Sequence, residues 1–286
     1  LATTGMLLAG LAHLLVRKSW QSGTRTPFVA YAMLLLLISF LAVLAALCKE
    51  SGLTLLVFMA GIELVSARPS SRALARGGLA LAAGALVAFT LLAVVRFRVT
   101  EGAGAAFGFV DTPVQYHSDI DVRGWSYLFQ HAYYAKLLVL PGNLSWDYSF
   151  DAIPLLRATW RDVRSLSVVT AYLSFLMLVS WSLAGNGKRR LLLGLQQILI
   201  PFVPASNLFF TVGVTVGERL LYPSTVGAAM ALAAIGQHLE GSGKVSKASE
   251  RPGLHVPSRR WWPSFLGYGL LLVYLFRCGR RVLEWR

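Results

Sequence analysis

Two pairs of opposite charge stand directly beside long apolar stretches of the sequence. Lys49-Glu50 lies in LAALCKESGLTLL, and Glu218-Arg219 lies in VTVGERLLYPS. An ionisable group in or beside a membrane segment costs about 2.5–3.5 kcal/mol on insertion scales, so its presence calls for a reason. Two such pairs at one depth would form a polar cavity for an anionic substrate. The alternative is that each pair only extends its charges into the lipid headgroup region.

A second polar feature is the stretch PFVPASNLFF, which places Pro201, Pro204, Ser206 and Asn207 in or near a membrane segment. Prolines interrupt a helix and free backbone carbonyls, which is tolerated where protein or water satisfies them. Asn207 could then hydrogen-bond a sugar hydroxyl. A kinked helix without a ligand explains the stretch equally well.

Other ionisable residues carry weaker signals. Asp147 and Asp151 are four apart and could form a carboxylate pair, although acidic residues are common in water-exposed loops. Glu63 is more typical of a helix-packing residue, or of one that extends its charge to the headgroup region, than of a site, and His117 and His131 have no metal-ligand partners at useful spacing. We therefore expect no metal and no cofactor.

Composition indicates where these residues lie. The chain of 286 residues is 56% hydrophobic and only 14% charged, with a mean hydropathy of +0.59. Soluble domains are about 45–50% apolar and about 25% charged, so a soluble globular protein is excluded. The net charge of +14 does not indicate nucleic-acid binding, because the basic residues lie in short clusters between apolar runs. Cys48 and Cys278 match neither a disulfide framework nor a metal site.

The hydropathy pattern predicts an all-α polytopic membrane protein with about eight transmembrane helices. Crossing a bilayer takes about 20 mainly apolar residues. The candidate spans are 1–16, 28–47, 53–67, 77–95, 167–185, 191–210, 218–236 and 261–276. The further apolar stretch 127–141 contains His131 and Lys136, and we interpret it as an interfacial or re-entrant helix.

Basic residues in the short loops predict the orientation. Cytoplasmic loops are enriched in Lys and Arg, and fourteen such residues fall on one face, five of them in the loop 237–260. The opposite face carries six in its short loops and one long segment, 96–166. We therefore expect 48–52, 96–166, 211–218 and the C-terminus to be extracytoplasmic.

The long segment contains a turn and a modification signal. Pro141-Gly142 marks the turn, and Trp146 and Tyr148 are residue types that favour a membrane interface. Asn143-Leu144-Ser145 is an N-glycosylation sequon, which agrees with an extracytoplasmic location. We expect Asn143 to be a glycosylation site.

Three motifs, in this order, resemble the transmembrane and tetratricopeptide-repeat (TPR) family of protein O-mannosyltransferases. They are LCKESGLTLL, LVLPGNLSWDYSFDAIPLL and IPFVPASNLFFTVGVTVGERLLYPSTVG, and the resemblance covers roughly residues 30–236. The ending RVLEWR is similar to the linker before the family's luminal repeats.

The resemblance implies a GT-C glycosyltransferase in the endoplasmic-reticulum membrane. Its donor would be dolichyl-phosphate mannose, and its acceptors would be Ser and Thr hydroxyls of luminal, secretory-pathway proteins. Lys49 and Arg219 are our candidates for binding the donor phosphate, since both place a cation near the headgroup plane. Glu50 and Glu218 would orient those cations, and Asn207 would support the site.

The resemblance also implies missing parts. The expected catalytic base is an aspartate in a luminal loop before Leu1, so the fragment alone should be inactive. DTPVQYHSD precedes the second motif where the family more often has Asn-Pro. We expect residues 1–276 to form the transmembrane domain and residues 277–286 to begin a luminal linker towards the repeats. The alternatives are a membrane transporter, for which the internal repeats usual in transporters are not found, or a non-catalytic membrane scaffold.

Overall fold

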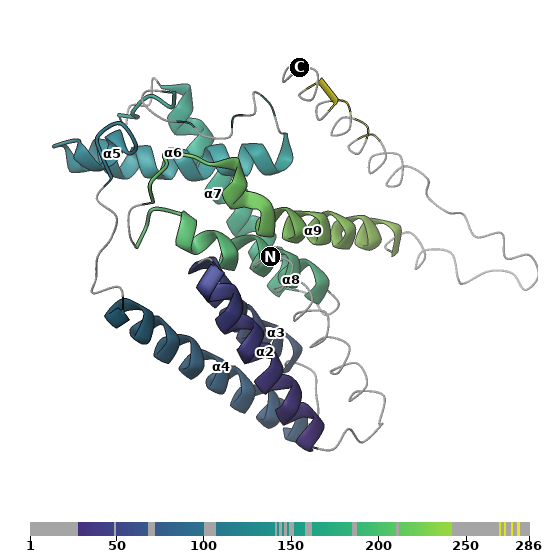
Figure 1. Cartoon of the computed structure of the whole chain (residues 1–286). Helices are drawn as coiled ribbons and strands as arrows, with labels where there is room; N and C mark the ends of the chain where they lie inside the picture. Colours follow the sequence, from purple (N-terminus) through teal and green to yellow (C-terminus); the bar gives the residue numbers. More distant parts are fainter. Residues whose placement is uncertain are drawn as a thin grey trace, which may run out of the picture.

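The computed structural model describes most of the chain between residues 28 and 241. The described stretches are 28–48, 50–67, 72–99, 107–140, 152–157, 162–184, 188–209 and 212–241, with single residues between and after them. Regular structure in these stretches is entirely helical, with eight α-helices and no strand (Figure 1). The all-α prediction is confirmed for this part of the chain, whereas the span 1–16 and most of 261–276 lie outside the described residues.

The helices differ widely in length. Three short 3-10 turns link or precede them: η1 (Glu50–Leu53), η2 (Val203–Ala205) and η3 (Glu218–Leu221). The α-helices are α2 (Phe28–Cys48), α3 (Thr54–Ala67), α4 (Arg72–Val99), α5 (Pro113–Tyr116), α6 (Ile120–Val139), α7 (Val163–Leu183), α8 (Arg189–Phe202) and α9 (Tyr222–Gly241).

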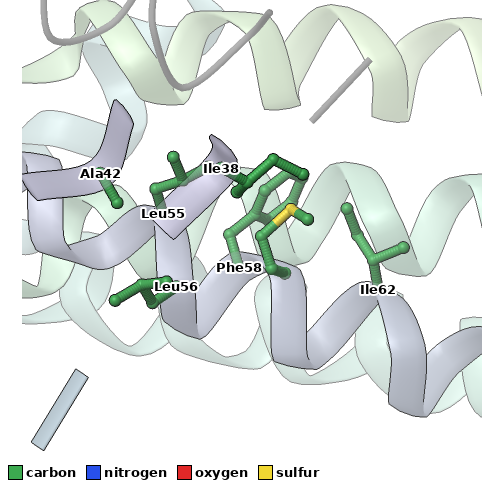
Figure 2. Close-up of a cluster of buried hydrophobic side chains, with 7 residues drawn as sticks. Ile38, Ala42, Leu55, Leu56, Phe58 and Ile62 are labelled. Carbon is green, nitrogen blue, oxygen red and sulfur yellow. The ribbon is translucent and has the colours of Figure 1, made fainter. Parts of the chain in front are cut away.

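Helix α3 is enclosed by protein on nearly every side. Its Leu55, Leu56 and Ile62 are at most 2% exposed and belong to one apolar cluster with Ile38 and Ala42 of α2 (Figure 2). α3 also contacts α4 and α8. Its 14 residues extend only about 21 Å at ~1.5 Å per residue, which is less than the ~30 Å of a bilayer core. This helix is therefore a packing centre for its neighbours.

Helices α8 and α9 approach closely enough for their backbones to touch. A Cβ atom added to Gly227 of α9 would lie 2.5 Å from the Ile198 nitrogen, and one on Gly194 of α8 would lie 2.7 Å from the Ala231 nitrogen. Small residues four apart, here Gly227 and Ala231, allow such contact between membrane helices. The Ser224 hydroxyl also donates to the Ile198 carbonyl at 2.9 Å. Close packing thereby fixes the start of α9 against α8.

Three segments are long and apolar enough to cross a membrane. They are Ala82–Val99 in α4, Val163–Leu183, which is α7, and Glu218–Leu239, which is η3 with α9. Only 11%, 11% and 28% of their residues, respectively, are buried inside the protein. Exposed apolar surface of this extent fits contact with lipid tails, so the chain is a multi-pass membrane protein.

Helices α5 and α6 lie together at one end of the molecule, away from α2, α3 and α4 (Figure 1). α6 contains 20 residues and packs against α7 and η3. It is not among the three candidate spans. The interpretation of 127–141 as a helix that does not cross the membrane stays a prediction.

Most predicted spans within the described residues match observed helices, but only three of them contain a segment long and apolar enough to cross a membrane, so the predicted number of about eight is not confirmed. The segments 28–47 and 53–67 correspond to α2 and α3, and 77–95 lies within α4. The prediction for 191–210 was too long, because α8 ends at Phe202 and only the short η2 follows. Pro201 and Pro204 cannot donate backbone hydrogen bonds, so the helix ends there.

Candidate functional site

The second and third motifs meet at the start of α9. The Tyr148 nitrogen donates to the Val216 carbonyl at 3.1 Å, and the Gly217 nitrogen donates to the Tyr134 hydroxyl of α6 at 2.9 Å. We call the residues that meet here, Tyr134, Ser145, Tyr148 and Val216–Arg219, the loop junction. It joins parts of the chain that are about 70 to 83 positions apart in sequence.

Glu218 is the polar centre of the loop junction. Its Oε1 atom accepts a hydrogen bond from the Ser145 nitrogen at 2.6 Å and another from the Tyr148 hydroxyl at 3.0 Å. Bonds to an ionised carboxylate are stronger than neutral ones. Burial, together with hydrogen bonds to Tyr133 and Glu218, raises the pKa of Tyr148. The Tyr148 hydroxyl therefore stays protonated at neutral pH and remains a donor to Glu218.

Apolar and aromatic packing supports these polar contacts. Tyr134, Tyr148 and Val216 are buried in one cluster with Leu137, Ile153 and Leu221. The rings of Tyr133 and Tyr148 meet edge to face with centroids 5.5 Å apart, and those of Tyr134 and Phe202 at 4.9 Å. Aromatic pairs in this arrangement stabilise packing by about 0.5–1.5 kcal/mol beyond their area burial. The loop junction is thus rigidly built from three segments.

Arg219 has different surroundings from Glu218. Its side chain is exposed, and within the described part of the chain its guanidinium makes no hydrogen bond or ion pair. It lies one residue into the candidate span Glu218–Leu239, hence at one membrane end of that span. A planar guanidinium can bind phosphate oxygens in a bidentate manner. Arg219 is therefore available for an anionic ligand at the membrane boundary.

The interrupted end of α8 is fixed by α6. His131 Nε2 lies 2.7 Å from the Ser206 carbonyl, and its Nδ1 lies 2.6 Å from the Tyr172 hydroxyl of α7. Asn207 has φ +57°, in the left-handed region that Asn tolerates better than most residues. Its Oδ1 accepts from the Val212 nitrogen at 2.7 Å, and its Nδ2 lies 3.5 Å from Gln130 Oε1. The Asn207 amide thus has protein partners, and its role towards a sugar stays a prediction.

The turn that carries the first motif joins α2 to α3. Lys49 and the Glu50 side chain lie outside the described residues, so their predicted roles are not tested. Close packing holds the turn, because a Cβ atom on Gly52 would overlap the backbone of Ala45. Arg96 of α4 donates from Nη1 to the Ala46 carbonyl at 2.9 Å. Arg96 therefore fixes the end of α2 immediately before Lys49-Glu50.

The remaining predicted residues have varied positions. Asn143, Asp147 and Asp151 lie outside the described residues. Glu63 is buried on α3, as expected of a packing residue, and it has a partner within the protein. Within the described stretches no three His, Cys, Asp or Glu residues lie close enough to bind a metal.

Sequence reasoning missed four contributors to these arrangements. The sequence signals do not single out Tyr134 or Arg96, and they indicate Ser145 only as part of the sequon and Tyr148 only as an interfacial aromatic residue. Their roles depend on contacts between distant parts of the chain. The available signal was the density of tyrosines in YYAKLL and SWDYSF, since buried tyrosine hydroxyls usually have a hydrogen-bond partner.

A cavity of about 780 Å³ lies along α4, apart from the loop junction. Its lining is mainly apolar, with Thr90 and Arg98 as polar members. None of the loop-junction residues lines it. The cavity is therefore not part of the site around Glu218.

Comparison with known proteins shows similarity to the TMTC family of protein O-mannosyl-transferases. Residues 101–176 match the family model described as Protein O-mannosyl-transferase TMTC, DUF1736, a range that includes Tyr134, Ser145 and Tyr148. The human Protein O-mannosyl-transferase TMTC4 is 31% identical over 94% of this chain and 37% of its own length. The Caenorhabditis elegans Protein O-mannosyl-transferase F38B6.6 is 31% identical over 86% of the chain and 31% of its own length. No solved structure matches.

The alignments cover most of this chain but only part of each relative. The matches extend over nearly the whole chain, yet the chain spans little more than a third of the length of the first relatives it matches. A third relative, the mouse Protein O-mannosyl-transferase TMTC1, is 34% identical over 48% of the chain. The similarity therefore extends beyond residues 101–176 to the charged motifs on both sides.

Proposed function

Because the chain belongs to the TMTC family of protein O-mannosyl-transferases, we propose that it forms the membrane part of such an enzyme. The proposed reaction moves mannose from dolichyl-phosphate mannose to Ser or Thr hydroxyls of luminal, secretory-pathway proteins. The proposed setting is the endoplasmic-reticulum membrane, with a GT-C arrangement of the spans. The names of the relatives support the sugar and the protein acceptor.

The observation that carries the proposal is the loop junction. Two motifs far apart in sequence converge on Glu218, and the next residue is an exposed arginine at the end of a candidate span. A lipid-linked phosphate sits at the headgroup plane, where a cation at that depth can reach it. Arg219 would bind the phosphate directly, and Lys49 is proposed as a second cation.

The chemistry assigns a specific task to these cations. The acceptor oxygen attacks the anomeric carbon of mannose, and the bond between that carbon and the phosphate oxygen breaks. The bonding electron pair stays on the departing dolichyl phosphate, and a carboxylate base takes the hydroxyl proton. Negative charge develops on the phosphate as the bond breaks, so a fixed guanidinium lowers the barrier. The base is not assigned to any residue of this chain.

The carboxylate of Glu218 has a supporting role in this proposal. Its Oε1 atom already accepts hydrogen bonds from Ser145 and Tyr148. These bonds favour a role for Glu218 in holding the loop in place over a role as the base that accepts the hydroxyl proton. Glu50 and Asn207 remain proposed supporting residues.

Mannose transfer by a chimera tests the proposal. The matching segment of human TMTC4 is replaced by this chain, and transfer from dolichyl-phosphate mannose to an acceptor protein is measured in microsomes. We expect the chimera to transfer mannose and Arg219→Ala to lower the rate about 10²–10³-fold, the range seen when one donor to a developing oxyanion is removed. Arg219→Lys keeps the positive charge but loses the bidentate hydrogen bonding of the guanidinium, so it should retain part of the rate.

Three outcomes would contradict the proposal or one of its parts. A correctly inserted chimera that transfers no mannose, while native human TMTC4 does so, would favour a non-catalytic scaffold. Unchanged transfer by Arg219→Ala would remove the phosphate role from that residue. Flux of a water-soluble anion through vesicles that contain the chain would favour the transporter alternative.

A further inference from the structure

Three consecutive residues immediately before Arg219 are each bonded to another part of the chain. The Val216 carbonyl accepts from the Tyr148 nitrogen, the Gly217 nitrogen donates to the Tyr134 hydroxyl, and Glu218 Oε1 accepts from Ser145 and Tyr148. The distances are 3.1, 2.9, 2.6 and 3.0 Å, respectively. The backbone that leads into Arg219 is therefore fixed from two sides, by α6 and by the 145–148 segment.

The residues that provide these bonds are themselves immobilised by packing. Tyr134 and Tyr148 are buried, and each ring has an aromatic neighbour, Phe202 for Tyr134 and Tyr133 for Tyr148. Packing of the rings therefore restricts where the two hydroxyls can lie. The Arg219 side chain, in contrast, is exposed.

Such an arrangement has a physical consequence for ligand binding. A flexible segment loses conformational entropy when it binds, whereas a segment held in place beforehand does not. An exposed arginine on a fixed backbone can therefore bind an anion more tightly than the same arginine on a loose loop.

We propose that Tyr134 and Tyr148 are positioning residues that hold the Val216–Glu218 backbone so that Arg219 faces a phosphate group at the membrane surface. This inference rests on the proposed function for the identity of the phosphate, which is that of dolichyl phosphate. The positioning itself depends only on the contacts of the loop junction. Neither tyrosine is assigned a contact with substrate.

The chain offers a matched control for both tyrosines. Tyr127 lies seven residues before Tyr134 on α6, is half-buried, and makes no hydrogen bond to a described residue. Tyr127→Phe therefore removes the same atom as the other two substitutions, from the same helix as Tyr134, without touching the loop junction. Tyr134→Phe and Tyr148→Phe each remove one hydroxyl from the loop junction and keep the ring in the cluster.

The first experiment measures motion at position 219 without any ligand. Cys48 and Cys278 are replaced by serine, Arg219→Cys carries a nitroxide label, and electron paramagnetic resonance spectra are recorded from chains in liposomes. We expect a restricted label that becomes clearly more mobile with Tyr134→Phe or Tyr148→Phe and is unchanged with Tyr127→Phe. Equal mobility in all variants would overturn the proposal, whatever the chain binds.

The second experiment measures affinity for dolichyl phosphate in liposomes. We expect Tyr134→Phe and Tyr148→Phe to weaken binding about three- to tenfold, as loss of one hydrogen bond in the arrangement predicts, and Tyr127→Phe to leave it unchanged. In an Arg219→Ala background, the tyrosine substitutions should have no further effect. Equal losses in both backgrounds would show that the tyrosines act on structure alone and would overturn the positioning role.

The two experiments separate this inference from the proposed function. If the unsubstituted chain does not bind dolichyl phosphate, the proposed function is contradicted. The spectra of the nitroxide label at position 219 still decide whether the Val216–Glu218 backbone is held in place. Normal binding with unchanged label mobility contradicts the positioning role and leaves the proposed function standing.

Discussion

Glu218 and Arg219 are adjacent in sequence, yet their side chains face different surroundings. Glu218 is half-buried and bonded to Ser145 and Tyr148, whereas Arg219 is exposed. Neighbouring residues at the start of a helix can face different directions, so one can hold the fold while the other meets a ligand. Glu218 thus has a structural role, and Arg219 is the residue proposed to bind a ligand.

His131 should make the stability of this protein depend on pH. The Ser206 carbonyl can only accept, so Nε2 carries the proton and neutral Nδ1 accepts from Tyr172. Burial lowers the pKa of His131, with the bond to Ser206 as a smaller opposing effect. A lowered pKa means that the unfolded chain binds more protons, so this stabilisation is present above about pH 6.5 and is lost on acidification.

Thermal unfolding of the purified chain between pH 7.5 and pH 5 checks this expectation. The melting temperature should fall on acidification, and His131→Gln should show a smaller fall. An identical pH dependence in both proteins would mean that His131 does not contribute.

Sequence alone could identify charges but not their partners. Lys49-Glu50 and Glu218-Arg219 are conspicuous because ionisable residues are expensive beside apolar runs. The partners of Glu218 are a backbone nitrogen and a tyrosine hydroxyl some 70 residues away, and neither has a local signature. The same holds for Arg96, which follows an apolar run and bonds to a carbonyl 50 positions earlier.

At the scale of helices, close contact between α8 and α9 fixes where the Glu218–Arg219 turn lies. Gly227 meets the backbone of α8, so even a methyl group must push the helices apart. Gly236 lies two and a half turns later on α9 and has open space around its Cα. The two glycines therefore lie on the same helix but differ in the space around them.

Alanine at these two glycines should have opposite effects. Gly227→Ala overpacks the interface and should cost about 1–3 kcal/mol. Gly236→Ala should stabilise the helix by up to about 1 kcal/mol, because glycine is the poorer helix former. Melting temperatures of the two variants in detergent check this, and equal or reversed shifts would contradict the close packing of α8 on α9.

Helix positions followed from the sequence where one strong signal dominated. Long apolar runs located α2, α4, α7 and α9, since spanning length is a strong constraint. The end of α8 was misplaced, because apolar residues continue past Pro204 while the backbone does not stay helical. Hydropathy measures the free energy of transfer to lipid and does not report where a helix is interrupted by proline.

At the scale of the whole molecule, the orientation in the membrane remains a prediction from the loop charges. The predicted loop 237–260 overlaps α9, which ends at Gly241, so the test sequon is introduced within 242–260. It should stay unmodified, and one placed in a tag after Arg286 should receive a glycan. A mobility shift reversed by endoglycosidase H is the measurement. A glycan on the loop 237–260 would reverse the predicted orientation and place Arg219 on the cytoplasmic side.

Photo-crosslinking of the donor lipid tests the central claim most directly. A dolichyl-phosphate analogue with a photoreactive group beside the phosphate is added to membranes containing the chain, and labelled peptides are identified by mass spectrometry. The account predicts labelling around residues 212–223 that dolichyl phosphate competes away and that Arg219→Ala reduces at least tenfold, a loss equivalent to about 1.4 kcal/mol. Labelling that is equally strong with Arg219→Ala, or that competitor does not reduce, would contradict a phosphate site at the loop junction.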